Sequence, residues 1–153
     1  PEHRSLLAIT VSSIAQALGG SYLCGEEASQ ILVEHLLLGA QVLDSGVDYF
    51  NQVGEKAVLV RGDRPDIQMA ALQTSVACLV LTTNANPLEY VLYEAREQGV
   101  PLIQTPHSTM EAARLLETIV LQSRFDHPQK LEVMASLVGE HLALDAIPMP
   151  LDV

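Results

Sequence analysis

The chain has 153 residues, of which 48% are hydrophobic and 18% are charged, and its formal net charge at pH 7 is −11. This apolar content supports one folded domain and excludes an intrinsically disordered chain. The acidic balance, with aromatic residues at 4% and no tryptophan, argues against nucleic acid and anionic membranes as partners, because both attract basic surfaces.

The first part of the chain predicts a helix followed by a strand. Thr10 is a suitable N-cap for an apolar-periodic helix over residues 11–18, which the Gly19-Gly20 pair ends. Residues 21–24 predict a short strand. The apolar stretch 31–43 is interpreted as a strand in its first half, although its pattern also fits a helix. A short helix is then expected from Asp44 or Ser45, ending at Gly54.

The second half repeats one arrangement three times: a short apolar run, a polar loop and a helix. The apolar runs are residues 57–60, 76–81 and 100–103, and the helices that follow end near residues 72, 98 and 121. Short buried strands that alternate with helices pair in parallel through right-handed crossovers. The sequence therefore predicts an α/β fold with a mostly parallel sheet.

The sequence marks the starts of the last two of these helices. Asn86 is a candidate N-cap, with Pro87 at the first helical position and Glu89 at the third. Ser108 and Glu111 have the spacing of a capping box.

Beyond these units, Pro128 is expected to open a last helix with an apolar stripe. The stripe consists of Leu131, Met134, Val138, His141 and Leu142. We expect a linker over residues 1–8, an α/β domain over 9–122, a C-terminal helix over 123–144 that packs on the domain or on a partner, and a flexible tail over 145–153.

Polar residues follow the three predicted parallel strands. The carboxyl ends of such strands and the amino ends of the next helices open at one edge of the sheet. That edge would carry Arg61, Asp63, Arg64, Thr82, Thr83, Asn84, Asn86, Thr105, His107 and Ser108. Its two arginines, together with free helix amides, predict an anion pocket. The alternative is that Asp63, Asn86 and Ser108 act as helix caps.

The cysteines and histidines predict neither catalysis nor metal binding. Cys24 and Cys78 lie in apolar strand-like runs, which favours buried thiols in a reducing, cytoplasmic compartment over a disulfide. His107 has no nucleophile near it in the sequence, and no histidine pair has metal-ligand spacing with a third ligand. The glycine motifs of dinucleotide and P-loop sites are also absent. We therefore expect no catalytic residue, no metal and no cofactor.

Three segments together resemble the DRTGG domain family. They are residues 62–72, which begin Gly-Asp-Arg-Pro-Asp-Ile-Gln, residues 79–84, Leu-Val-Leu-Thr-Thr-Asn, and residues 101–109, Pro-Leu-Ile-Gln-Thr-Pro-His-Ser-Thr. The lead-in before them is also similar, so that the resemblance covers roughly residues 8–122. It implies a three-layer α/β/α fold like the N-terminal domain of HPr kinase. It also implies a parent protein with a dethiobiotin-synthetase-like P-loop domain or a phosphate acetyltransferase domain.

The resemblance maps the Asp and Arg of the family onto Asp63 and Arg64, and its threonine onto Thr82. The paired glycines of the family fall at Thr83 and Asn84, which is a departure. The Asp-Thr pair before the last helix becomes Ser108-Thr109, which is another. If the glycines serve close approach of a ligand to the backbone, this chain binds something different or nothing. The expected ligand-binding residues are Arg61, Gly62, Asp63, Arg64, Thr82, Thr83, Asn84, Thr105, His107, Ser108 and Thr109.

These observations lead to one preferred function and two alternatives. The preferred function is a non-catalytic regulatory module, within a phosphotransacetylase-family protein, that binds a small anionic metabolite or nucleotide. A structural oligomerisation module is the first alternative, and an enzyme that handles acyl phosphates is the second. A homodimer is expected, because a domain this small with this many apolar residues leaves some of them outside its core.

Overall fold

The computed structural model describes residues 3–39, 46–121 and 123–142. Five strands form the main sheet in the order β2-β7-β6-β5-β4. They are β2 (Ser21–Cys24), β4 (His35–Leu38), β5 (Lys56–Arg61), β6 (Val76–Thr82) and β7 (Leu102–Gln104). The four strands from β4 to β7 are parallel, and β2 pairs antiparallel with β7 at one side. The mostly parallel sheet expected from the sequence is confirmed.

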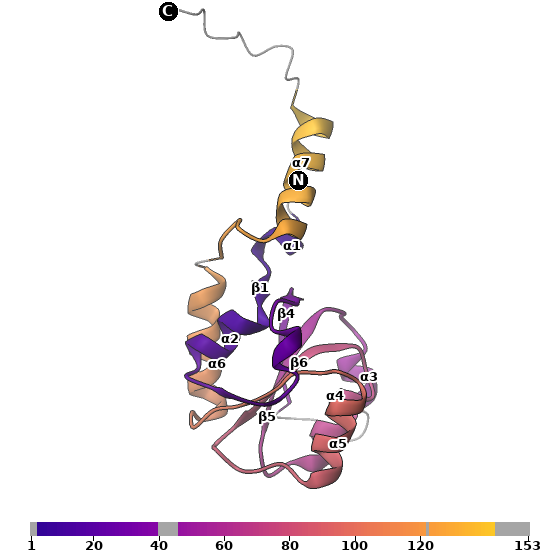
Figure 1. Cartoon of the computed structure of the whole chain (residues 1–153), viewed down its shortest axis with the longest axis vertical. Coiled ribbons are helices and arrows are strands. Elements are labelled where there is room, and N and C mark those ends of the chain that lie inside the picture. The colour runs from indigo at the N-terminus through magenta and orange to yellow at the C-terminus, as the bar shows by residue number, and fades with distance from the viewer. Residues whose placement is uncertain (1–2, 40–45, 122, 143–153) are drawn as a thin grey trace, which may run out of the picture.

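Helices cover both faces of this sheet (Figure 1). One face carries α2 (Val11–Ala17) and α6 (Thr109–Val120), and the other carries α4 (Pro65–Leu72) and α5 (Glu89–Glu97). The three-layer α/β/α architecture is therefore confirmed. The remaining elements are α1 (Arg4–Leu7), η1 (Glu26–Ala28), α3 (Gly46–Phe50), α7 (Pro128–His141) and the small antiparallel pair β1 (Ile9–Thr10) and β3 (Leu32–Val33).

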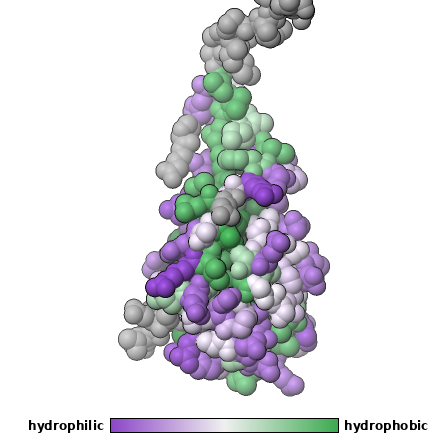
Figure 2. Space-filling model, turned by 90° about the vertical axis from the view of Figure 1, so that its left-hand side faces the viewer, coloured by the Kyte–Doolittle hydropathy of each residue, from purple (hydrophilic) through white to green (hydrophobic). Residues whose placement is uncertain are grey.

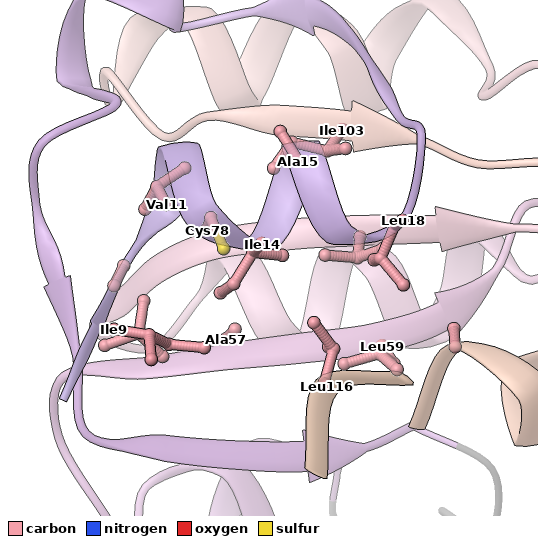
Figure 3. Packing of buried hydrophobic residues seen from close by; sticks show 14 residues of the cluster. Ile9, Val11, Ile14, Ala15, Leu18, Ala57, Leu59, Cys78, Ile103 and Leu116 are labelled. Atoms are coloured by element: carbon pink, nitrogen blue, oxygen red, sulfur yellow. The ribbon is translucent and has the colours of Figure 1, made fainter. Parts of the chain in front are cut away.

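The central strand β5 shows why the apolar runs are continuous rather than alternating. Its residues 57–60 are all fully buried, because each face of the sheet is covered. Ala57 and Leu59 pack into the cluster under α2 and α6, which Figure 3 shows, whereas Val58 and Val60 pack into the cluster under α4 and α5. Successive side chains point to opposite faces of a strand, so one short run supplies both cores.

Local signals set two helix starts as the sequence predicts. The Thr10 hydroxyl accepts a hydrogen bond from the Ser13 amide at 3.1 Å and caps α2. The Ser108 hydroxyl accepts one from the Glu111 amide at 3.3 Å, while the Glu111 carboxylate accepts from the Ser108 amide at 2.9 Å. This capping box satisfies amides at the start of α6 that have no partner within the helix.

The predicted start of α5 is wrong. The helix begins at Glu89, with Leu88 at the N-cap position, and Asn86 lies outside it. The side-chain amide of Gln104 explains the difference, because it donates to the Ala85 carbonyl at 3.0 Å and to Asn86 Oδ1 at 3.3 Å. The loop is thus tied to β7, and its backbone turns helical only two residues beyond Pro87.

The apolar stretch after residue 30 forms strands, as preferred, but it forms two of them. Val33 pairs with Ile9 in the small sheet, whereas His35 pairs with Lys56 in the main sheet. The short helix that follows is α3, of which the structure describes residues from Gly46. The predicted start at Asp44 or Ser45 lies outside the described residues.

The last helix, α7, begins at Pro128 as predicted and contacts α1. Figure 1 shows α7 projecting from the end of the domain where α1 lies. None of the helices in the described ranges combines the length and the apolar character that crossing a membrane requires.

Candidate functional site

The parallel register brings the ends of three strands to one edge of the sheet. Arg61 at the end of β5 lies opposite Thr82 at the end of β6, and Leu81 lies opposite Gln104 at the end of β7. The ends of these strands, the loops that follow them and the first residue of α6 carry all the residues that the sequence assigns to the site. We call this region the carboxyl edge.

The two arginines of the carboxyl edge are exposed, and each is paired with a nearby aspartate. Arg61 Nε donates to Asp63 Oδ1 at 2.9 Å, and Arg64 Nε donates to Asp66 Oδ1 at 3.0 Å; in each pair the second nitrogen and oxygen also bond. The hydrogen bonds from the guanidinium groups lower the pKa of both carboxyl groups. Fork-shaped pairs of this kind also suit phosphate groups, so an anion at this edge would compete with the aspartates.

Asp63 is therefore not a helix cap. The N-cap position of α4 belongs to Arg64, whose side chain has no acceptor for a helix amide. Asp66 does lie in the first turn of α4, where the helix dipole favours a carboxylate. The capping interpretation thus fails for Asp63 and Asn86 and holds for Ser108.

A buried glutamine holds the loop after β5 in place. Gln68 is fully buried on α4, and its Nε2 donates to the carbonyl oxygens of Arg61 at 2.8 Å and of Gly62 at 3.1 Å. The Gly62 amide donates to the Thr82 carbonyl at 3.1 Å, and a Cβ at Gly62 would lie 2.5 Å from the Ala85 oxygen. The β6–α5 loop therefore lies directly against Gly62, and any larger residue at this position would displace it.

The sequence analysis did not select Gln68 as a site residue. A signal for it exists, because Gln68 is the polar member of a helix face whose other buried residues, Ile67, Ala71 and Leu72, are apolar. Its Oε1 is buried and has no hydrogen-bond partner among the described residues. Buried amides at such positions usually serve main-chain groups, as Gln68 does here.

The turn after β6 has an unusual backbone conformation. Thr83 and Asn84 have φ values of 69° and 54°, in the left-handed region that glycine adopts most easily. Their amides donate to the carbonyl oxygens of His107 at 2.8 Å and Thr105 at 3.1 Å. At the positions where the sequence departs from paired glycines, the chain thus keeps a backbone typical of glycine.

The remaining residues of the carboxyl edge are mostly used for structure. The hydroxyl groups of Thr82 and Thr109 are hydrogen-bonded at 2.7 Å, and the buried Thr105 hydroxyl donates to the Leu18 carbonyl at 2.8 Å. By contrast, the side chains of Thr83, Asn84 and His107 make no hydrogen bond to the described residues.

The described residues of the carboxyl edge contain no paired groups of the kind that activate a nucleophile. At the carboxyl edge, none of the hydrogen bonds between described residues joins a hydroxyl or thiol to a histidine or lysine. Within the same described ranges, no group of three or more His, Cys, Asp and Glu side chains could hold a metal ion. Both cysteines are free thiols, with Cys78 fully buried, and burial raises the pKa of that thiol to about 12.

Comparisons with known proteins identify a domain family. The model of the DRTGG domain matches residues 13–119. The cobalt-dependent inorganic pyrophosphatase of Clostridium perfringens (strain 13 / Type A) is 28% identical over 64 residues, which are 42% of this chain and 12% of that protein.

A solved structure supports the same assignment of the fold. It contains the CBS and DRTGG domains of the regulatory region of Clostridium perfringens pyrophosphatase, complexed with the activator diadenosine tetraphosphate. The TM-score is 0.61 at 21% sequence identity, and the match covers 80% of this chain and 52% of that one. This chain therefore corresponds to a part of each of these relatives.

Proposed function

The chain belongs to the DRTGG domain family, and from this premise we propose that it is a non-catalytic regulatory module that binds a small anionic metabolite or nucleotide. The observation that carries the proposal is the pair of exposed arginines, Arg61 and Arg64, at the carboxyl edge. A guanidinium group can exchange an aspartate for a phosphate without losing its paired hydrogen bonds. The relative whose regulatory region binds diadenosine tetraphosphate supports a nucleotide as the ligand.

The proposal includes a larger parent protein in which the module acts on a catalytic domain. The resemblance described above favours a phosphotransacetylase-family parent. The pyrophosphatase relative supports the more general idea that a DRTGG domain accompanies an enzyme domain and regulates it.

A structural oligomerisation module is the second candidate, and one observation favours it. Large apolar side chains remain exposed on and beside α7, among them Leu131, Leu142, Leu121 and Phe125. Exposed apolar patches usually mark an interface. The two functions are compatible, because a regulatory module can act through subunit contacts.

A binding experiment with diadenosine tetraphosphate tests the preferred function. At a ligand concentration a hundred times its dissociation constant, the free energy of unfolding should rise by about 2.7 kcal/mol. Arg64→Ala should weaken binding and leave the melting temperature unchanged, because its side chain is exposed and its surface ion pair contributes little to stability.

Arg96→Ala is the matched control. Arg96 is exposed in the last turn of α5, away from the strand ends that form the carboxyl edge. Its removal should leave binding unchanged. Equal binding by the wild type and the Arg64 variant would contradict the proposed site, and a large loss of stability in that variant would make Arg64 a structural residue instead.

A further inference from the structure

A cleft of about 910 Å³ separates the body of the domain from the base of α7. One wall comes from β1, α2, β3 and the residues before β3, and the other comes from α6, the α6–α7 loop and the first turn of α7. None of the residues assigned to the carboxyl edge lines it. Its volume lies in the range of known small-molecule sites.

Lys130 gives this cleft its chemical character. Lys130 is only 3% exposed, yet it forms part of the cleft lining. Its Nζ donates to Ser123 Oγ at 2.6 Å and to the Arg124 carbonyl at 2.8 Å, which leaves the third ammonium proton without an acceptor among the described residues. The described residues also place no carboxylate within ion-pair distance of it.

The Phe125 ring, whose centroid lies 5.9 Å from Lys130 Nζ, offers the ammonium a cation–π contact but no negative charge. A buried ammonium without a counter-charge is costly, since it has lost its hydration. Consistent with this, burial lowers the pKa of Lys130, and the nearby Asp126 offsets the effect only in part. An anion in the cleft would supply both the missing acceptor and the missing charge.

The rest of the lining favours the same kind of ligand. Arg124 is exposed and forms no ion pair with the described residues. Two of the eight lysine and arginine residues of an acidic chain thus meet at one cleft. Polar groups from Ser13, Gln16 and Gln30 lie on the opposite wall, beside the apolar side chains of Ile9 and Leu32.

Lys56, the other buried lysine among the described residues, has a purely structural role and serves as a comparison for Lys130. Lys56 is 1% exposed, and its Nζ donates to the carbonyl oxygens of Val53 and Ser75. It lies at the start of β5 and does not line the cleft. Neither burial nor a third ammonium proton without an acceptor among the described residues therefore distinguishes Lys130 from Lys56. Lys130 differs because it lies on the wall of a cleft that is also lined by Arg124, which forms no ion pair with the described residues.

We propose that this cleft binds a small organic phosphate, with the phosphate group on Lys130 and Arg124 and the organic part against Ile9 and Leu32. The site is separate from the carboxyl edge, so the inference does not rest on the proposed function. The Ser123 hydroxyl donates to the carbonyl oxygens of Ala8 and Leu6 and accepts from Lys130. It is therefore not a nucleophile activated by the lysine, and the site is one of binding.

Ligand binding at this place would connect two parts of the molecule. The walls belong to the body of the domain and to the base of α7. The base of α7 also contacts α1, and His127 Nε2 is hydrogen-bonded to the Gln30 carbonyl on the opposite wall at 3.1 Å. A molecule held by both walls would fix the orientation of α7. Occupancy of the cleft would therefore act on the rest of the protein by changing how α7 is held.

Amide chemical-shift mapping of the full ¹⁵N-labelled chain tests the inference, with inorganic phosphate and AMP as probes. Signals from Ser13, Gln30 and Lys130 should move and saturate, and AMP should bind more tightly than phosphate because it also covers apolar surface. Arg124→Gln, at an exposed position that does not endanger the fold, should weaken AMP binding by about threefold or more. Lys130→Met should weaken it by about tenfold or more.

Arg114→Gln is the control, because Arg114 is exposed on α6 and does not line the cleft; it should bind AMP as the wild type does. The inference is overturned if no cleft signal saturates up to about 10 mM probe, or if Arg124→Gln and Lys130→Met bind like the wild type. Shifts confined to Arg61, Arg64 and their neighbours would also overturn it, while supporting the carboxyl edge as the ligand site.

Discussion

The backbone at Thr83 and Asn84 has a conformation that does not suit both of their side chains equally. Both occupy the left-handed region, with φ values of 69° and 54°. Asparagine tolerates this conformation, whereas a β-branched threonine is strained in it. The hydrogen bonds of their amides to the carbonyl oxygens of Thr105 and His107 hold the turn in place despite this strain.

Thr83→Gly should therefore stabilise the protein. Removing the β-branched side chain relieves the strain, and the greater freedom of glycine in the unfolded chain offsets part of the gain. We expect the free energy of unfolding to rise by about 0.5–1 kcal/mol, measured from denaturant midpoints. Asn84→Gly should give a smaller rise, and a destabilised Thr83 variant would show that the threonine side chain makes a contact that outweighs the strain.

Tyr22 carries a buried polar atom that has no hydrogen-bond partner among the described residues. This atom is the hydroxyl oxygen, and burial raises the pKa of the group. Tyr22→Phe should raise the free energy of unfolding by about 1 kcal/mol, because an unpaired buried hydroxyl loses its hydration without compensation. Tyr93→Phe is the control, since Tyr93 is 62% exposed and should leave stability unchanged. A loss of stability in the Tyr22 variant would reveal a partner for the hydroxyl.

At the scale of the elements, the start of α6 depends on one local motif. Ser108→Ala should lower the free energy of unfolding by about 1 kcal/mol, because it removes the acceptor of the Glu111 amide. Chemical denaturation measures this change. Ser75→Ala is the control, because Ser75 is exposed and its side chain makes no hydrogen bond to the described residues. Ser123 is unsuitable, since its hydroxyl donates to the Ala8 carbonyl. If Ser108→Ala left the free energy of unfolding unchanged, the capping box would contribute nothing to the stability of the helix.

The same motif makes part of the stability depend on pH. Hydrogen bonds from the amide and hydroxyl of Ser108 hold the pKa of Glu111 below its ordinary value of 4.5. A carboxyl group with a lowered pKa stabilises the fold above its ordinary pKa, and this contribution is lost as the pH falls through the lowered value. Glu111→Gln should therefore reduce the loss of stability on acidification, measured by denaturation at a series of pH values below 4.5. An unchanged pH profile would contradict this.

The helix starts also show how far the sequence can predict this structure. Thr10 and Ser108 were predictable because their caps join residues three positions apart. The start of α5 was not, because the loop around Asn86 is held by Gln104, which is 18 residues away. The aspartate at position 63 was misassigned for a similar reason, since a nearby guanidinium competes with the helix for its carboxylate.

At the scale of the whole molecule, the layers of the fold were the most predictable feature. The run of residues 57–60 is apolar throughout, which is typical of a strand covered on both faces. The cleft beside Lys130 could not be predicted, because its walls come from segments far apart in the sequence, such as those of Thr10 and Lys130, which are 120 positions apart. In the sequence, that lysine is one of several charged residues near a helix start.

The position of α7 leads to a prediction about assembly. Figure 2 shows hydrophobic residues gathered along the projecting part of the molecule, which Figure 1 identifies as α7. Leu131 is 54% exposed there, and Leu121 and Phe125 are exposed in the loop before the helix. Exposed apolar surface of this kind is rare on stable monomers. A second copy of the chain is the expected partner, because two-fold pairing buries the same patch on both subunits.

Light scattering over a hundredfold dilution should accordingly give a mass about twice 16.6 kDa at the highest concentration. Leu131→Glu should shift the chain to the monomer, because it places a charge among the exposed apolar side chains while its exposed position spares the core. Leu88→Glu carries the same change at a similarly exposed site at the start of α5 and should remain dimeric. A mass near 16.6 kDa at every concentration would rule out the dimer, and dissociation by both variants would place the interface elsewhere.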